Sequence, residues 1–191
     1  ARGEAKFAVN RRVLKDGKWT GFGVVPDGPV DHSLNVLAVH HEGKLSGILV
    51  NYACHCTTLG PRFNRICGDW VGYAQEQLEK DHPGIVGMIA IGCGADANPE
   101  PRGTLALVEA HGRELAREAT QIQQQPLREI TTAPACRLET LQLPFQPHFS
   151  RPQWESRATN SGIVGFHARK WLARLDRGET PPPTLAYPVQ T

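Results

Sequence analysis

The fold follows from two stretches of the chain, LSGILVNYACHCTTLG at residues 45–60 and IVGMIAIGCGADANPEP at residues 85–101. Each opens with an apolar run, Leu45–Ala53 in the first and Ile85–Ile91 in the second. Near-continuous apolar runs of this length are typical of strands that are buried on both faces. The two stretches therefore predict two buried strands, each followed by a polar loop.

The segment between these strands predicts a helix. Asp69 stands at an N-cap position, Val71, Ala74 and Leu78 recur at helical spacing, and Pro83-Gly84 ends the pattern. A strand, a helix and a second strand in this order favour parallel pairing of the two strands. The loops that follow parallel strands lie at the same edge of the sheet.

This edge is where the chemistry is expected. Ligands of open α/β sheets bind outside the carboxyl ends of the strands, so His55, Asp96 and Asn98 should converge there. Each residue also has a purely structural interpretation. His55 could be satisfied within a strand end, while Asp96 and Asn98 suit a turn in a Gly-Ala-Asp-Ala-Asn-Pro loop. Asp69 could be an ordinary helix cap.

The rest of the chain predicts further strands and helices around this unit, with a mixed, partly parallel β-sheet flanked by helices as the α/β fold class. Gly, Pro and Asp make residues 15–29 a turn-rich loop, and prolines mark a connection at residues 143–163. The expected elements are strands at Ala5–Asn10, Leu34–His40 and Ala135–Leu143, and helices at Thr104–Gln124 and Val164–Asp176.

Composition excludes several function classes. Hydrophobic residues make up 40% and charged residues 21% of the chain, a mix typical of a folded domain. The net charge is +2, with Asn10-Arg11-Arg12 the only basic cluster, so no nucleic-acid partner is expected. No apolar run approaches the length of a membrane span.

Five cysteines form neither paired zinc-ribbon spacings nor a regular disulfide framework. We expect Cys54, Cys56, Cys67 and Cys93 to be free, and mostly buried, thiols. Ligation of a metal and a disulfide remain alternatives. A thiol mechanism with Cys54, Cys56 or Cys93 as nucleophile and His55 as base is a further possibility, although neighbours on an extended strand do not readily face each other.

Four short motifs resemble the catalytic domain of the neutral/alkaline ceramidase family, in the family's order and spacing. The likeness covers residues 3–125 well and the remainder loosely. The motifs are Asn10-Arg11-Arg12, Asn51-Tyr52-Ala53-Cys54-His55, Gly68-Asp69-Trp70-Val71-Gly72-Tyr73 and Gly94-Ala95-Asp96-Ala97-Asn98-Pro99.

The resemblance implies a zinc-dependent hydrolase that cleaves the amide of an N-acyl sphingoid base or a related lipid. It makes His55 a zinc ligand, with Asp96 and Asn98 as catalytic-loop residues, and Asp96 a candidate acceptor for the second ring nitrogen of His55. The family's other histidine, its glutamate and its tyrosine ligand have no counterpart here. Residues 1–191 are therefore expected to be one incomplete catalytic domain, inactive and weakly zinc-binding by itself.

Two positions depart from the family pattern. Asn98 stands where the family has a serine, and Cys67 replaces another serine. An amide cannot act as a hydroxyl nucleophile or proton relay, so a non-catalytic lipid- or glycan-binding descendant is the alternative function. The family resemblance favours a secreted or periplasmic location, whereas clustered thiols favour the cytoplasm, and the sequence does not decide between them.

Overall fold

The computed structural model describes residues 2–190 and divides into two compact units, Ala1–Glu129 and Ile130–Thr191. Each unit is described by itself. The elements of the first unit are β1 (Arg2–Glu4), β2 (Ala8–Lys15), β3 (Lys18–Val25), β4 (Ser33–His41), β5 (Lys44–Tyr52), α1 (Asp69–Asp81), β6 (Val86–Ile91), β7 (Ala97–Pro99) and α2 (Leu105–Gln123).

The main sheet of the first unit has the strand order β1-β4-β5-β6. Strand β4 is antiparallel to β5 across a tight turn, and β5 is parallel to β6, with Ile48 opposite Gly87 and Tyr52 opposite Ile91. The predicted β-α-β unit with parallel strands is confirmed, as is the mixed α/β fold class. Helix α1 provides the connection that parallel neighbours require.

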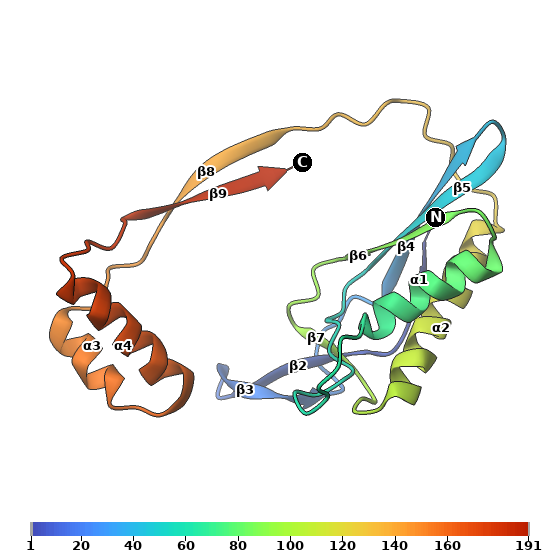
Figure 1. Ribbon diagram of the computed structural model, residues 1–191. Helices are drawn as coiled ribbons and strands as arrows, with labels where there is room; N and C mark the ends of the chain where they lie inside the picture. Colours follow the sequence, from blue (N-terminus) through green and yellow to red (C-terminus); the bar gives the residue numbers. More distant parts are fainter. Residues whose placement is uncertain (1, 191) are drawn as a thin grey trace. The chain divides into compact units, whose positions relative to one another are not determined.

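Helices α1 and α2 lie side by side against this sheet (Figure 1). The core between them includes Tyr52, Trp70 and Phe7, whose ring centroids lie 4.9–5.9 Å apart. The Tyr52 hydroxyl donates to the Ala5 carbonyl at 2.8 Å, so its polar end is satisfied inside the core. The two helices approach closely because position 112 is glycine: a Cβ there would lie 2.6 Å from Tyr73 Cβ.

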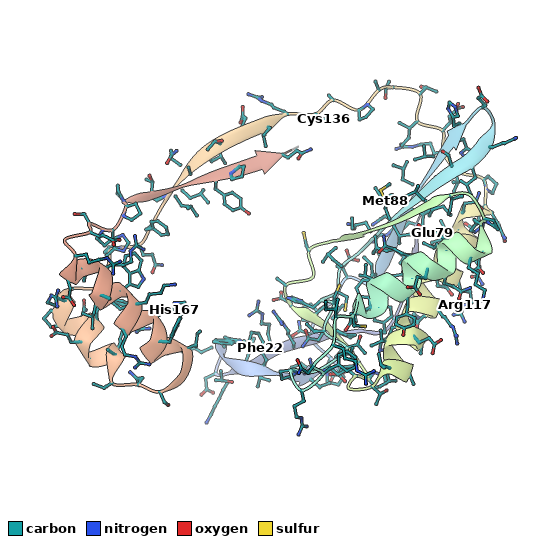
Figure 2. All side chains as sticks on the ribbon, in the orientation of Figure 1. Phe22, Glu79, Met88, Arg117, Cys136 and His167 are labelled. Atoms are coloured by element: carbon teal, nitrogen blue, oxygen red, sulfur yellow. The ribbon has the colours of Figure 1, made fainter. Side chains whose placement is uncertain are left out.

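Only one face of the main sheet is covered within the first unit. Ile48 and Val50 are fully buried beneath the helices, whereas Leu37 and Val39 are more than two-fifths exposed on the other face. Met88 lies on β6 with its side chain away from α1 (Figure 2), while the neighbouring Gly87 faces that helix. The expectation that these strands are buried on both faces is therefore wrong for this chain, since side chains alternate between the two faces of a strand.

A second sheet, of order β3-β2-β7, joins the N-terminal segment to the loop after β6. Strand β2 pairs with β7 antiparallel, with Val9 opposite Asn98. The loop expected at residues 15–29 is wrong in part, because Lys18–Val25 forms strand β3. Asp16 and Gly17 both have positive φ and make the two-residue turn that joins β2 to β3.

The second unit contains an antiparallel pair of strands and two helices that contact each other. Its last helix matches the expectation closely. The range 143–163, expected as a Pro-rich connection, contains a helix that begins with a capping box between Ser150 and Gln153. The elements are β8 (Leu138–Pro144), α3 (Arg151–Ala158), α4 (Gly162–Asp176) and β9 (Thr184–Gln190).

Across residues 2–190, no helix has both the length and the hydropathy needed to cross a membrane.

Candidate functional site

The loops that follow β5 and β6 meet, as the parallel pairing predicts. The His55 backbone N–H donates to the Ala97 carbonyl at 3.1 Å, and the Gly92 N–H donates to the Tyr52 carbonyl at 3.0 Å. Gly94 makes this approach possible, because a Cβ at that position would lie 2.6 Å from the Cys54 nitrogen. The site is therefore built by main-chain contact between two loops.

The imidazole of His55 is fixed through one of its two nitrogens. Nδ1 lies 2.7 Å from the Gly94 carbonyl oxygen and 3.0 Å from the Ala97 carbonyl oxygen. Carbonyls only accept hydrogen bonds, so Nδ1 carries a proton, and in the neutral imidazole the lone pair lies on Nε2. Among residues 2–190, no protein group bonds to Nε2. A backbone carbonyl on one nitrogen and a free second nitrogen is the usual arrangement of a metal-binding histidine.

A buried aspartate and a tryptophan hold the loop that carries His55. The Asp69 carboxylate accepts the backbone N–H groups of Thr58 at 3.2 Å, Leu59 at 3.1 Å and Trp70 at 2.8 Å. The Trp70 indole N–H donates to the His55 carbonyl at 2.9 Å. Asp69 adopts a left-handed φ of 51°, which is uncommon outside glycine. It therefore secures a loop as well as starting α1, instead of capping the helix in the ordinary way.

Asp96 lies on the same loop but not against His55. Its carboxylate pairs with the Arg12 guanidinium at 2.7 Å, and its side chain is 61% exposed. The expectation that Asp96 accepts from the second nitrogen of His55 is wrong, because the carbonyls of Gly94 and Ala97 take that place. A catalytic role for Asp96 stays a prediction.

Asn98 is buried, and β7 positions it beside β2. Its Oδ1 accepts from Arg11 Nη1 at 3.4 Å and from the Thr57 hydroxyl at 3.2 Å. Arg11 is itself fixed by a bond from Nε to the Ala95 carbonyl at 3.1 Å and lies over the Phe22 ring, 4.4 Å from its centroid. The three predicted site residues thus belong to one loop cluster, although their side chains have different partners.

The cysteines are free, as predicted, but only Cys54 is buried. The expectation that they form a buried group is wrong, since Cys56, Cys93 and Cys136 are exposed. Burial raises the pKa of the Cys54 thiol. Cys56 is exposed as a residue, but its sulfur is partly shielded from solvent, and this desolvation raises the pKa of the Cys56 thiol to about 11. Nucleophilic cysteines need the opposite shift. These two thiols are therefore poor candidates for the thiol mechanism.

The metal-ligand set within the described part of the chain is incomplete. No group of three or more His, Cys, Asp or Glu side chains in residues 2–190 could hold a metal ion. His55 has the orientation of a ligand, but a stable zinc site needs three or four protein donors. A metal at this place requires ligands from outside these residues.

Two of the cavities bear on the choice of site. One of about 230 Å³ adjoins the loop after β6 and is lined in part by Ala53, Cys93 and Asp96. A larger one, of about 550 Å³, lies in the second unit beside Trp154 and Trp171. None of the three predicted site residues lines the larger cavity, so its size does not make it the candidate site.

Sequence reasoning missed the partners of the site residues. Arg11 and Arg12 served only as landmarks of the resemblance, and Thr57 was not considered. The sequence did contain a signal for the strand that carries both arginines, namely the turn pair Asp16-Gly17 that follows it. Strand β7 has three residues, which is too short to show any periodicity, so its pairing with β2 was not predictable.

No protein-family model matches the sequence, and no curated protein matches it significantly. Solved structures do match. A structure described as a ceramidase complexed with C2 has a TM-score of 0.61 and 22% identity, covering 73% of this chain and 24% of that chain. The crystal structure of neutral ceramidase from Pseudomonas aeruginosa has a TM-score of 0.62 and 18% identity, covering 99% of this chain and 37% of that one.

This chain therefore spans about a quarter to two-fifths of the length of these structures. At such identities the likeness concerns the fold, which is the fold that the sequence resemblance implies. The two loops that bring His55, Asp96 and Asn98 together belong to a chain with the fold of part of a neutral ceramidase.

Proposed function

We propose that this chain contributes to the active site of a zinc-dependent hydrolase that cleaves an amide bond, with an N-acyl sphingoid base or a related lipid amide as substrate. The supporting observation is the orientation of His55, whose Nδ1 is held by two backbone carbonyls and whose Nε2 has no protein partner in residues 2–190. The fold of neutral ceramidase supports the reaction class.

His55 would serve as one ligand of the zinc. A bound zinc ion polarises a carbonyl group and lowers the pKa of a bound water to about 7. The chain's own contribution is orientation: the carbonyls of Gly94 and Ala97 accept from Nδ1 and leave Nε2 as the nitrogen available to a metal. Because residues 2–190 offer no cluster of three donors, the remaining ligands must come from elsewhere in the protein.

A non-catalytic lipid- or glycan-binding function is the second candidate. Asn98 favours it, because an amide replaces the hydroxyl that the resemblance predicts. The two candidates differ in metal content and in turnover.

The full-length protein should be assayed on an N-acyl sphingoid base with a fluorescent acyl chain, before and after treatment with a zinc chelator. We expect release of the fatty acid, loss of activity in the chelator and recovery when zinc is restored. Binding of the lipid without turnover, in protein that holds no zinc, would favour the non-catalytic candidate. Activity that resists the chelator and is lost on thiol alkylation would favour the cysteine mechanism.

A further inference from the structure

The carboxamide of Asn98 has an orientation that its neighbours dictate. Arg11 Nη1 lies 3.4 Å from one end of the carboxamide, and a guanidinium can only donate. That end must therefore be the oxygen, because an NH₂ group there would face another donor. The Thr57 hydroxyl donates to the same oxygen at 3.2 Å.

This orientation leaves the amide nitrogen of Asn98 as an unused donor. Its oxygen has two donors, whereas Nδ2 has no acceptor among residues 2–190. Asn98 is only 6% exposed, so the NH₂ group is held in place with little freedom. Because Nδ2 is not fully shielded from solvent, a substrate oxygen can reach this fixed donor.

The backbone that carries Asn98 also holds the proposed metal ligand. The peptide that joins Ala97 to Asn98 presents its carbonyl to both the backbone N–H and the Nδ1 of His55, at 3.1 and 3.0 Å. The strand pairing of Val9 with Asn98 fixes the other side of this peptide. His55 and Asn98 are thus held on a common main-chain frame.

We propose that Asn98 Nδ2 donates a hydrogen bond to the carbonyl oxygen of the scissile amide and stabilises the negative charge that develops on it, with Arg11 and Thr57 as positioning residues. The proposal rests on the proposed function and deepens it. The water oxygen bonds to the carbonyl carbon and gives up a proton, while the carbonyl π electrons move to the carbonyl oxygen. That electron pair then re-forms the C=O bond as the C–N bond breaks, and the amine leaves with the proton that the water gave up. At the position where the resemblance predicts a serine, the Asn98 carboxamide supplies its NH₂ group as the donor, so this role does not require a hydroxyl.

The test compares variants at position 98 in the full-length protein with the fluorescent N-acyl sphingoid base. Asn98→Asp keeps the size of the side chain and its acceptor for Arg11 but removes the NH₂ donor, and Asn98→Ala removes both groups. Loss of one such donor lowers kcat by about 100- to 1,000-fold. We expect that loss in both variants, with KM changed less than about threefold and zinc content unchanged, and thermal unfolding is measured to show that each variant is folded at the assay temperature.

The positioning role is tested by Arg11→Met, alone and combined with Asn98→Ala. If Arg11 acts through Asn98, its substitution lowers kcat by about tenfold alone and has no further effect in the Asn98→Ala background. Arg117→Met on α2 is the matched control, because Arg117 is exposed and pairs with Glu118 away from the site. An equal loss from Arg11→Met in both backgrounds would overturn the positioning role.

Asn98→Asp separates loss of the donor from loss of the hydrolase. An Asn98→Asp variant with unchanged kcat would overturn the donor role while leaving the proposed hydrolase standing. Wild-type protein that neither binds nor hydrolyses the amide would overturn both. Wild-type protein that binds the amide without turnover would overturn the proposed hydrolase. Calorimetry of amide binding then tests Asn98 separately. Binding about tenfold weaker in Asn98→Ala supports the donor role, and equal binding overturns it.

Discussion

At the residue scale, Asp69 carries much of the local order of the site. Its buried carboxylate accepts three backbone N–H groups, two of which belong to the loop that follows His55. The neighbouring Trp70 bonds to the His55 carbonyl. The backbone of Asp69 is left-handed, a conformation that is uncommon outside glycine, and these buried contacts hold it in place. Asp69 thus supports the loop geometry on which the orientation of His55 depends.

Substituting Asp69 by alanine should destabilise the fold. The Thr58 N–H lies in a buried residue and would lose its acceptor, and a buried donor without a partner costs about 1–3 kcal/mol. We expect Asp69→Ala to lower the free energy of unfolding by about 2–3 kcal/mol in urea titrations of the full-length protein. Asp27→Ala, at an exposed aspartate, is the control. Equal stability of the two variants would show that the loop does not depend on this carboxylate.

The loop cluster at this scale was predictable only in outline. The apolar strands and their order place His55, Asp96 and Asn98 at one sheet edge, because parallel strands end together. The partner of each side chain depends on rotamers and on the three-residue strand β7, which leave no pattern in a single sequence. For this reason the Asp96–Arg12 pair and the carbonyls on His55 emerged only from the structure.

At the element scale, the pairing of α1 with α2 depends on a single small residue. A Cβ at Gly112 would lie 2.6 Å from Tyr73 Cβ, 2.8 Å from the Trp70 carbonyl oxygen and 2.9 Å from the Ala74 nitrogen. Two of these three atoms are backbone and cannot rotate away. The helices can therefore accept a larger residue only by separating, which disturbs the core around Trp70.

Gly112→Ala and Gly72→Ala form a matched pair of substitutions on the two helices. Alanine is favoured over glycine within a helix by about 1 kcal/mol, and a Cβ at Gly72 has nothing within 4 Å. We expect Gly72→Ala to be neutral or stabilising and Gly112→Ala to cost about 1–3 kcal/mol through overpacking, as measured by chemical denaturation. A stabilised Gly112→Ala variant would contradict the close helix contact.

The elements missed by sequence reasoning share a cause. In β3, Gly21 and Gly23 resemble turn residues, yet this edge strand forms by pairing with β2 across the Asp16-Gly17 turn. In α3, the prolines suggested a loop, although proline is tolerated in the first turn of a helix and Ser150 supplies its capping box. In both cases a local start signal was present but was outweighed by residues that usually break regular structure.

At the scale of the whole molecule, the first unit by itself leaves an apolar sheet face uncovered. Leu37, Val39 and Met88, on the sheet face away from α1 and α2, are each more than 40% exposed. Contiguous apolar surface of this kind commonly marks an interaction site. The chain spans 24% and 37% of the two ceramidase structures.

The zinc content of the full-length protein tests the central claim most directly. Zinc should be measured by mass spectrometry in the wild type, in His55→Ala and in His40→Ala, whose histidine is exposed on β4 and serves as the control. With His55 as a ligand, the wild type and His40→Ala should each hold about one zinc per chain and His55→Ala almost none, since catalytic zinc sites use three protein ligands and lose affinity without one. Equal zinc in His55→Ala and the wild type, or none in the wild type, would contradict the account.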